Sequence, residues 1–385
     1  MTQRKMEVIL IPSTLCNLRC SYCYELDKLA DKRRMSLESL AIVFERVARY
    51  FEQMGVDSAR FIWHGGEPLL LPPEYYHEAF ALQRSCFAGA RTQIVNVTQT
   101  NLTVLDDARI ELLRDGFDSC GVSLDLFGSL RVNKAGKCQE DRALANLERA
   151  RAAGVLLGGV TVLTRANRSR VRSIFEFYRE RDMAFRLLPL HAGDFRAGQW
   201  FEIGAADALR AFRELADLWL DAGSAPPIHP VTDIIEDVFR FHADGRRVGV
   251  YDKATWDPMI AIDREGFVSS YDDIHDRSKG YGNILSHELS EVLDGATHRA
   301  VIAHTGQRAA EACGRCAHYG ASCTGFGVVE GARDYWGKNA DGSLRCEVFA
   351  GLIAHIEQRL SAAGVRLREP STLGLPSTLA RAANA

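Results

Sequence analysis

The sequence lacks the features that would direct a protein to a membrane, to nucleic acid or to an export pathway. No apolar run approaches the roughly 18 residues that a membrane-spanning helix needs, and the apolar stretch near the N-terminus is too short for a signal peptide. A net charge of −3 provides neither a basic field for nucleic acid nor a polybasic patch for lipid. We therefore expect a cytoplasmic protein without a membrane or a nucleic acid as partner.

Cysteine is also absent from the long middle of the chain, between Cys138 and Cys313. Most of the 10 cysteines consequently fall near the two ends. In a chain without an export signal, this number of cysteines indicates metal binding or redox chemistry rather than disulfides. Cys86, Cys120 and Cys138 stand apart from both groups, and we expect them to be buried small apolar side chains.

The first cysteine group is the segment CNLRCSYC, which follows the apolar run Val8–Ile11. Thiolates are soft ligands that select iron–sulfur clusters or zinc. A structural zinc site needs four protein ligands, and no fourth cysteine or histidine stands near this segment. A [4Fe–4S] cluster held by only three thiolates would leave one iron open to an outside ligand. A zinc knuckle or a redox-sensing loop is the alternative.

CNLRCSYC resembles the CxxxCxxC signature of radical S-adenosylmethionine (SAM) enzymes, in which an aromatic residue, here Tyr22, precedes the last cysteine. The resemblance implies a [4Fe–4S] cluster on Cys16, Cys20 and Cys23, with SAM as the cofactor on the open iron and Tyr22 among the SAM-binding residues. In this family one electron from the cluster splits SAM to give a 5′-deoxyadenosyl radical.

Six apolar, strand-like runs alternate with segments of helical period as far as residue 190. This order predicts an α/β fold with a parallel sheet and right-handed crossovers. The strands are expected at Met6–Ile11, Ala59–Trp63, Gln93–Gln99, Ser119–Leu124, Leu157–Leu163 and Phe185–Leu190. The helices are expected at 36–54, 73–88, 106–115, 139–153, 170–181, 205–222 and 231–243. The resemblance implies a partial (β/α)6 TIM-like barrel, with the cluster loop after the first strand.

The resemblance continues to about residue 350 and predicts four regions along the chain. They are a radical SAM core barrel at 1–195, a helical linker region at 196–247, a SPASM/twitch-like auxiliary Fe–S domain at 248–350, and a C-terminal helix with a mobile tail at 351–385.

The second predicted strand runs into WHGGEPLL. Adjacent glycines allow a ligand to approach the backbone closely, and a carboxylate can bind an ammonium group, although such a segment is often only a turn. Directly after the second strand of a CxxxCxxC protein, it resembles the GGE motif of radical SAM enzymes. The resemblance implies that Gly65, Gly66 and Glu67 receive the amino group of SAM.

The third and fourth predicted strands end in TQTN and SLD. Small polar side chains at these places suit hydrogen bonds to a ribose or a carboxylate, and they equally suit helix caps and turns. The SPASM-type subgroup has TNG and SxDG here, whereas this chain has Leu102 and Leu126 in place of the glycines. The SAM-binding residues implied by the resemblance are Asn101, Ser123, Asp125 and Arg131.

Four further cysteines near the C-terminus can saturate a tetrahedral zinc ion or a [4Fe–4S] cluster, and their spacing does not separate the two. The stretch that begins at AIDREGFVSSYDD resembles a SPASM domain, whose seven cysteines hold two auxiliary clusters. Tyr271 and Gly327 stand where that family has cysteines. The resemblance implies one auxiliary [4Fe–4S] cluster, fully ligated by Cys313, Cys316, Cys323 and Cys346.

An acidic residue, Asp272, directly follows the position of the first missing cysteine. In sulfatase maturases of this subgroup, an aspartate at this place is the base that takes a proton from the substrate. The resemblance therefore implies a catalytic role for Asp272, and a polar turn is the alternative.

The resemblance as a whole implies a radical SAM peptide maturase, of the kind that modifies ribosomally synthesised precursor peptides (RiPPs). Such an enzyme abstracts hydrogen from a peptide side chain and forms a cross-link or an oxidised residue. Its partners would be the precursor peptide and an electron donor of the flavodoxin or ferredoxin type, and we expect no leader-binding domain before residue 6. The alternatives are a dehydrogenase of an aminocyclitol-like alcohol, a sulfatase-maturase-like oxidation of a protein, and a non-catalytic zinc-binding interaction protein.

Overall fold

The computed structural model describes residues 3–191, 198–270, 277–330 and 336–368. The chain divides into two compact units. Unit 1 comprises Met1–Leu124, Ser129–Gly158 and Asp257–Ala300, and unit 2 comprises Asp125–Gly128, Gly159–Trp256 and Val301–Ala385. These units cut across the regions expected from the sequence, so that division into four regions stays a prediction.

Unit 1 is organised around a sheet in which parallel strands form the centre. Its strands are β1 (Lys5–Ser13), β2 (Ser58–Gly65), β3 (Gln93–Thr100), β4 (Ser119–Ser123), β8 (Met259–Asp263), β9 (Phe267–Ser269) and β10 (Gly282–Asn283). They lie in the order β10-β9-β8-β1-β2-β3-β4. The strands from β8 to β4 run parallel, while β9 and β10 are antiparallel additions at one edge.

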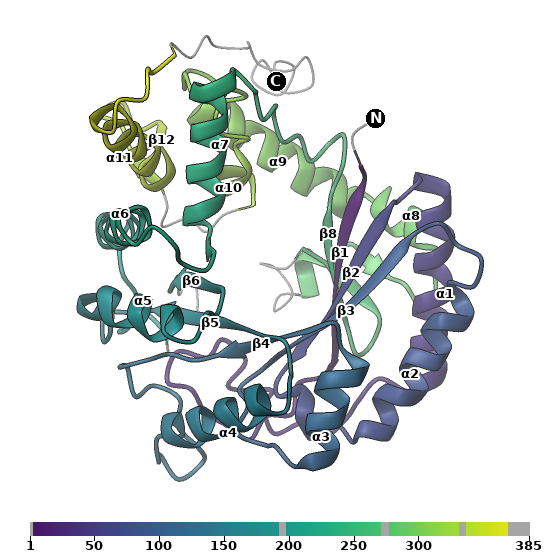
Figure 1. The fold of residues 1–385 in the computed structure, drawn as a ribbon. Helices are drawn as coiled ribbons and strands as arrows, with labels where there is room; N and C mark the ends of the chain where they lie inside the picture. The colour runs from purple at the N-terminus through teal and green to yellow at the C-terminus, as the bar shows by residue number, and fades with distance from the viewer. Residues whose placement is uncertain (1–2, 192–197, 271–276, 331–335, 369–385) are drawn as a thin grey trace. The chain divides into compact units, whose positions relative to one another are not determined.

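Helices follow the strands of unit 1, and those that join β1 to β4 cover one face of these strands (Figure 1). The helices are α1 (Leu37–Met54), α2 (Pro73–Cys86), α3 (Asp107–Glu111), α4 (Glu140–Ala152), α8 (Leu289–Leu293) and the start of α9 (Ala296–Cys313), with the short turns η1 (Pro68–Leu70), η2 (Leu112–Gly116) and η4 (Arg277–Lys279). Local signals define α1 at both ends. The Ser36 side chain caps the Ser39 amide, and Gly55 ends the helix in the left-handed conformation.

Aromatic side chains fill the core between these helices and the sheet. Phe44 of α1 packs edge-on against Phe61 and Trp63 of β2, with ring centroids 5.7 and 6.4 Å apart. Tyr76 and Phe80 of α2 meet the same Trp63 at 5.4 and 5.6 Å. Such edge-to-face contacts add to the free energy gained by burying the rings, and they hold α1 and α2 against this face of the sheet.

A segment far along the chain completes the sheet of unit 1. β8 pairs in parallel with β1, with Glu7 opposite Met259 and Ile11 opposite Asp263. β1 therefore has hydrogen-bonded neighbours on both sides, β2 and β8. This pairing explains why residues 257–300, expected in the auxiliary domain, belong to the same compact unit as the N-terminal strands.

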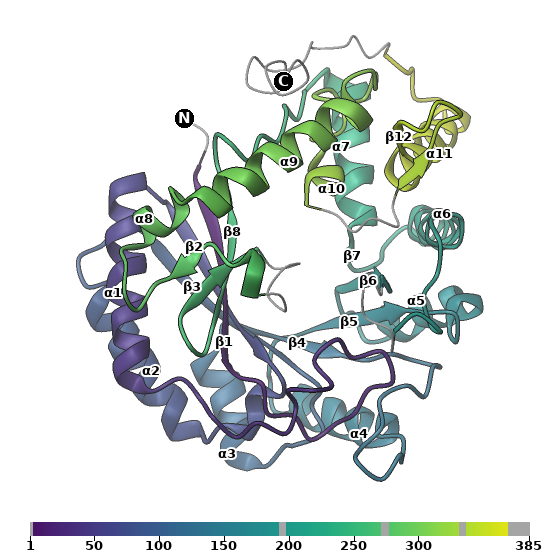
Figure 2. The same ribbon diagram turned by 180° about the vertical axis from the view of Figure 1, so that it is seen from behind.

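Unit 2 contains a second group of parallel strands and most of the later helices. Its elements are β5 (Leu157–Leu163, which starts in unit 1), β6 (Phe185–Pro189), β7 (Ile228–His229), β11 (Trp336–Lys338), β12 (Leu344–Cys346), η3 (Arg168–Arg170), α5 (Val171–Arg179), α6 (Ala205–Asp221), α7 (Val231–Asp244), α10 (Phe326–Val329) and α11 (Val348–Ala362). β5, β6 and β7 pair in parallel, and β11 and β12 form an antiparallel ribbon. Helix α11 packs against α6 and α7 (Figure 2).

The α/β fold and its six strand–helix alternations are confirmed. The strands and helices expected from the sequence agree with the observed ones over their central residues and differ only at the ends. The one internal difference falls in the segment 106–115, where α3 ends at Glu111 and the chain continues as the π turn Leu112–Gly116.

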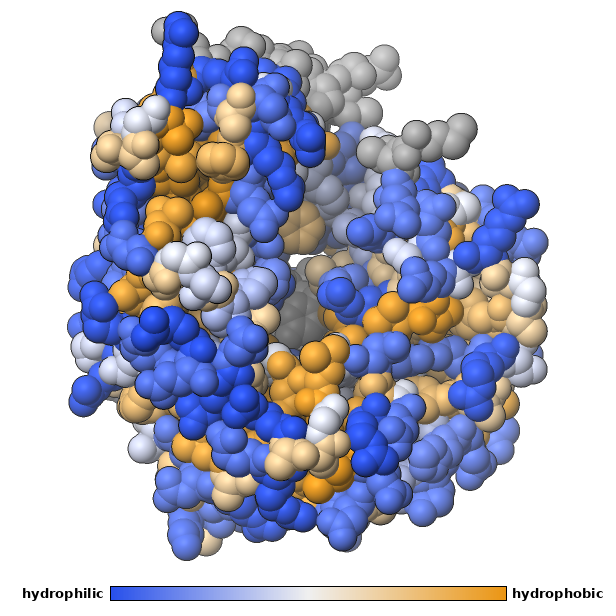
Figure 3. Space-filling view, viewed as in Figure 1, coloured by the Kyte–Doolittle hydropathy of each residue, from blue (hydrophilic) through white to orange (hydrophobic). Residues whose placement is uncertain are grey.

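The visible surface is mostly hydrophilic, with apolar residues in separate groups (Figure 3). Trp200 is the most exposed large apolar side chain among those described, at 78% of its full accessibility. None of the helices in the described ranges combines the length and hydropathy that crossing a membrane requires.

Truncation of the aromatic core should destabilise unit 1. Phe44 is fully buried, so Phe44→Ala removes packed ring contacts and is expected to cost about 3–5 kcal/mol of unfolding free energy. The fall in the urea midpoint, followed by circular dichroism, measures this loss. Ile42→Ala, at a 36% exposed position on the same helix, is the matched control. Equal midpoints for the two variants would contradict the assignment of Phe44 to the core.

Candidate functional site

The first three cysteines lie on one loop, residues 14–31, which begins where β1 ends and is called the cysteine loop below. The Cys16 amide donates to the Leu29 carbonyl at 3.0 Å, which closes the loop on itself. Leu18 and Leu29 of this loop are buried, at 1% and 2% exposure, and pack with Cys16 and Cys20 in one apolar cluster. The structure therefore brings the predicted cluster ligands together on a single ordered loop.

A second segment of unit 1 supports this loop from the other side. The Arg19 amide donates to the Val132 carbonyl at 2.6 Å, and the Ser21 amide donates to the Leu130 carbonyl at 3.0 Å. These two bonds hold the cysteine loop along residues 130–132, next to the predicted SAM ligand Arg131.

The environment of the sulfur atoms by itself favours protonated thiols, so thiolates here would need a cation beside them. Burial raises the pKa of the Cys16 thiol to about 11 and that of Cys23 to about 12, and a negative charge on Cys20 raises both further. Iron would supply the positive charge that three neighbouring thiolates need. Donors already point at the sulfurs. Cys16 Sγ lies 3.4 Å from the Leu18 amide and 3.9 Å from Asn101 Nδ2.

The glycine pair lets two backbone segments approach each other. A Cβ atom on Gly65 would lie 2.3 Å from the Ser13 carbonyl oxygen, and one on Gly66 would lie 2.3 Å from the carbonyl oxygens of Thr14 and Leu15. Gly65 also has φ +123°, which favours glycine. The atoms that need this space belong to the start of the cysteine loop, so the glycines are required by the chain's own packing. The SAM contacts implied for them stay a prediction.

The carboxylate of Glu67 is buried, at 2% exposure, and joins the ends of β2 and β3. Its Oε1 accepts from Thr100 Oγ1 at 2.5 Å and from the Leu69 amide at 2.9 Å, and its Oε2 accepts from the Asn101 amide at 2.7 Å. Burial raises the pKa of Glu67, and these three hydrogen bonds and the charge of Arg131 oppose that rise. Glu67 therefore organises the strand ends around the cysteine loop.

The amide of Asn101 connects β3 to the same loop. Its Nδ2 donates to Asn17 Oδ1 at 3.1 Å, and its Oδ1 accepts from the Thr103 amide at 2.9 Å. Leu102, in the position of the family's glycine, keeps a left-handed φ of +55°. Its carbonyl accepts from the buried Asn146 Nδ2 at 2.8 Å. The backbone shape of a glycine is thus retained here by a buried leucine.

Ser123, at the end of β4, accepts a 2.6 Å hydrogen bond from Gln99 Nε2. The Gln99 side chain lies over Gly121, where a Cβ atom would come within 2.1 Å of its Oε1. The sequence did not single out Gln99. The glycine two residues before Ser123 was the available signal, because it makes room for a side chain from the neighbouring strand.

Arg131 and Tyr22 contact each other beside the cysteine loop. Arg131 Nη2 donates to the Tyr22 hydroxyl at 3.2 Å, and Nη1 lies 3.9 Å from Cys20 Sγ. A guanidinium at a cluster ligand suits the binding of an anionic group there. Asp125, by contrast, belongs to unit 2, where its Oδ1 accepts from the Val162 amide at 3.1 Å.

The four C-terminal cysteines are gathered in unit 2. Cys313 ends α9, and Cys346 ends β12. Cys316 and Cys323 flank a tight turn, in which the Cys323 amide donates to the His318 carbonyl at 3.0 Å. Cys313, Cys316 and Cys346 share one apolar cluster. Residues far apart in the sequence thus form a second cysteine site.

Burial and mutual charge dominate this second site as well. Burial raises the pKa of Cys323 to about 12, and the charges of Cys346 and Cys316 add to the rise. The Gly325 amide opposes it by donating to Cys323 Sγ at 3.4 Å. No three His, Cys, Asp or Glu side chains in the described part of the chain are drawn together closely enough to hold a single metal ion. A cubane cluster instead takes one thiolate on each of its separate irons.

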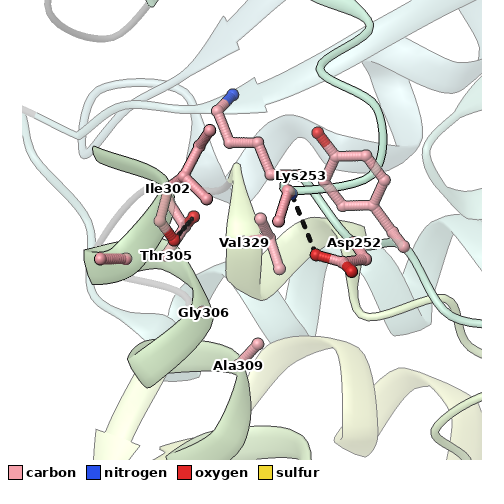
Figure 4. Close-up of a pocket in the computed structure, with 10 residues that line it drawn as sticks. Asp252, Lys253, Ile302, Thr305, Gly306, Ala309 and Val329 are labelled. Carbon is pink, nitrogen blue, oxygen red and sulfur yellow. Dashed lines mark hydrogen bonds between the residues drawn. The ribbon is translucent and has the colours of Figure 1, made fainter. Parts of the chain in front are cut away.

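A pocket lies beside the second cysteine site, between α9 and the segment Tyr251–Ala254 (Figure 4). Ala309 and Val329, which line it, also belong to the buried cluster around Cys313. Lys253 is 4% exposed, and its Nζ pairs with Glu330 Oε1 at 2.9 Å. The ion pair balances the buried charge, which leaves a mainly apolar pocket.

Two expectations about individual residues have different outcomes. Asp272, the predicted catalytic base, lies outside the described residues, as does Tyr271. Among the remaining cysteines, Cys120 is buried as expected, whereas Cys86 is half-buried and Cys138 is exposed. The prediction that Cys138 is buried was wrong. The residue lies in the turn before α4, where its backbone forms an isolated bridge with Val132 and its side chain is exposed.

Replacement of Gly66 should disrupt the first site selectively. Gly66→Ala forces a Cβ atom against two carbonyl oxygens, so the cysteine loop must shift, and we expect loss of most of the iron bound at Cys16, Cys20 and Cys23. Iron analysis after anaerobic reconstitution tests this. Gly204→Ala, where a Cβ atom would meet nothing within 4 Å, is the control and should retain its iron. Full iron occupancy in Gly66→Ala would show that the close approach is dispensable.

Comparison with known proteins relates this site to a family. Residues 10–178 match the model of the Radical SAM superfamily. A serine-type anaerobic sulfatase-maturating enzyme of Bacteroides thetaiotaomicron is 30% identical over 174 residues, which cover 44% of this chain and 42% of that enzyme. The chain therefore spans less than half the length of this curated relative.

Two solved structures share the fold at low sequence identity. Native anSMEcpe with bound AdoMet and Cp18Cys peptide has a TM-score of 0.69 at 18% identity, over 93% of this chain and 97% of that one. SuiB of Streptococcus suis bound to the precursor peptide SuiA has a TM-score of 0.54 at 16% identity, over 75% of this chain and 64% of that one. The predicted fold class is confirmed. The three-cysteine loop after β1 lies within residues 10–178, and this part of the chain is a radical SAM domain.

Proposed function

We propose that this chain is a radical SAM enzyme that modifies a side chain of a ribosomally synthesised precursor peptide, with a cross-link or an oxidised residue as the product. The convergence of three thiols, Asn101 and Arg131 on one loop within the matched domain carries the proposal. The peptide substrate is supported by two solved structures of similar fold that hold a Cp18Cys peptide and the precursor peptide SuiA.

In this proposal, Cys16, Cys20 and Cys23 hold a [4Fe–4S] cluster whose fourth iron takes SAM. When both are bound, the cluster would supply an electron to the sulfonium of SAM, which gives a 5′-deoxyadenosyl radical that removes hydrogen from the substrate. The side chains and backbone of this chain bind, orient and shield the pair.

The residues around the loop divide this work. Arg131 provides a positive charge beside Cys20 for the carboxylate of SAM, and the hydroxyl of Tyr22 holds the guanidinium in place. Glu67 accepts three hydrogen bonds and so positions the ends of β2 and β3. Gly65, Gly66 and Ser123 complete the set of proposed SAM ligands in unit 1.

The second cysteine site is proposed to serve electron transfer. Cys313, Cys316, Cys323 and Cys346 would ligate every iron of an auxiliary [4Fe–4S] cluster, which leaves none for substrate. Such a cluster would accept the electron released when a substrate radical is oxidised. Asp272 is the proposed base for the accompanying proton, and a flavodoxin- or ferredoxin-type protein is the proposed donor of the first electron.

A second candidate function is the oxidation of a protein side chain in the manner of sulfatase maturation. The identity to the Bacteroides enzyme and the fold shared with peptide-bound anSMEcpe favour it. Both candidates predict a product that has lost hydrogen, and they differ in the substrate.

The test is anaerobic incubation of the reconstituted full chain with SAM, dithionite and a short peptide encoded beside the gene. We expect 5′-deoxyadenosine together with a peptide that has lost two hydrogens, and fragmentation mass spectrometry separates a cross-link from an oxidised residue. The Cp18Cys peptide and an aminocyclitol, offered in parallel, test the maturase-like and dehydrogenase alternatives. If 5′-deoxyadenosine forms under none of these conditions, the radical SAM activity is refuted.

Cysteine variants separate the two proposed clusters. Joint replacement of Cys16, Cys20 and Cys23 by alanine should abolish 5′-deoxyadenosine and reduce the iron content from about eight to about four per chain. Cys346→Ala should retain 5′-deoxyadenosine but lose the modified peptide, because the electron acceptor is impaired. The exposed Cys138→Ala is the control and should behave like the unmodified protein. Stoichiometric zinc in place of iron would favour the non-catalytic alternative.

A further inference from the structure

The turn between β8 and β9 touches the cysteine loop although it lies more than two hundred residues further along the chain. We propose that Arg264, in this turn, is a positioning residue that holds Cys16, Cys20 and Cys23 in place for their cluster. It does so by joining the two ends of the cysteine loop, at Thr14 and Asp31, which together are called the neck. The inference rests on the proposed function for the identity of the bound group.

Arg264 bonds to both sides of the loop. Its Nη1 donates to Thr14 Oγ1 at 2.9 Å, and its Nη2 donates to Asp31 Oδ2 at 2.5 Å. Thr14 precedes the three cysteines and Asp31 follows them, so one guanidinium joins the two chain segments that enter and leave the loop. The Arg264 side chain is 11% accessible and that of Asp31 is 26% accessible, so the guanidinium is buried while the carboxylate still meets solvent.

Other direct connections across the neck are neutral hydrogen bonds. Ser13 Oγ donates to the Arg33 carbonyl at 3.3 Å, and the Met35 amide donates to the Pro12 carbonyl at 2.8 Å. Thr14 Oγ1 donates to the Lys28 carbonyl at 3.2 Å, and the Cys16 amide donates to the Leu29 carbonyl at 3.0 Å. All four are neutral hydrogen bonds, whereas the contact between Arg264 and Asp31 joins two opposite charges and is correspondingly stronger. Arg264 is therefore the strong link across the neck.

The sheet determines where Arg264 lies. Asp263, the residue before it, pairs with Ile11 of β1, two residues before the end of that strand. Within the turn, Asp263 Oδ1 accepts from the amides of Glu265 and Phe267 at 2.8 and 3.0 Å. Gly266 follows with φ +82°, a conformation that glycine tolerates. The strand pairing and the turn together fix the backbone position of Arg264 next to the end of β1, from which its guanidinium reaches the cysteine loop.

Arg33 provides a matched comparison. Its guanidinium donates to the same Asp31 carboxylate, at 2.7 Å from Nη2 to Oδ2, but its side chain is 69% exposed and no bond to Thr14 is described. Its second ion pair, at 3.3 Å, is with Glu265 on the surface. Removal of Arg33 thus removes one positive charge near Asp31 and leaves the neck closed.

The experiment compares Arg264→Met, Arg264→Lys and Arg33→Met in the reconstituted full chain. Two quantities are measured: the rate at which a chelator such as bathophenanthroline removes iron, and the change that SAM causes in the electron paramagnetic resonance spectrum of the reduced protein. For Arg264→Met we expect about tenfold faster loss of half the iron, since a charge-assisted bond across the neck is gone, and a diminished response to SAM. Arg264→Lys, which keeps the charge but not the two-pronged geometry, should fall between this variant and the unmodified protein. Arg33→Met should resemble the unmodified protein.

Equal behaviour of Arg264→Met and Arg33→Met would overturn the proposal. Faster loss of iron from both cysteine sites of Arg264→Met would also overturn it, because general destabilisation would then explain the effect. The same substitution placed in the variant without Cys16, Cys20 and Cys23 distinguishes these cases, and iron release there should not change. A protein that binds iron at the first site but shows no response to SAM would contradict the proposed function, while the chelation rates would still decide the role of Arg264.

Discussion

The pairing of β1 with a parallel strand on each side is the constraint on which the first site depends. The cysteine loop starts at the carboxyl end of β1, the glycine pair follows the end of β2, and Arg264 follows the end of β8. Parallel strands bring their carboxyl ends to one edge of a sheet. Segments 65–67 and 263–264 are consequently each held within hydrogen-bonding reach of segment 13–16, from opposite sides of β1.

Packing at this edge is decided by backbone atoms more than by side chains. Gly66 leaves no room for a methyl group between its own backbone and the carbonyls of Thr14 and Leu15. The Glu67 amide then donates to the Leu15 carbonyl at 2.8 Å, and its carboxylate binds the start of the segment after β3. The motif read from the sequence as a ligand-binding element is thus also a structural joint, and the same residues can serve both roles because backbone approach and side-chain chemistry use different atoms.

Charge at the two cysteine sites follows a common principle. Burial disfavours several thiolates close together, as the raised pKa values of Cys16, Cys23 and Cys323 indicate. Amide donors to the sulfur atoms offset part of this cost, from Leu18 in the first site and from Gly325 in the second. The remaining imbalance is of the sign that bound iron would correct.

Hydrophobic periodicity and capping residues by themselves determined the strands, the helices and their alternating order, because these patterns depend on near neighbours in the chain. Cysteine spacing likewise predicted the first ligand set, since its proposed members lie within eight residues of each other. Only the tertiary structure revealed that residues 257–300 belong with the N-terminal strands, that Gln99 reaches Ser123 over Gly121, and that Arg264 bridges Thr14 and Asp31. These contacts join residues from different strands, so they depend on strand pairing and register, which local patterns in a single sequence do not encode.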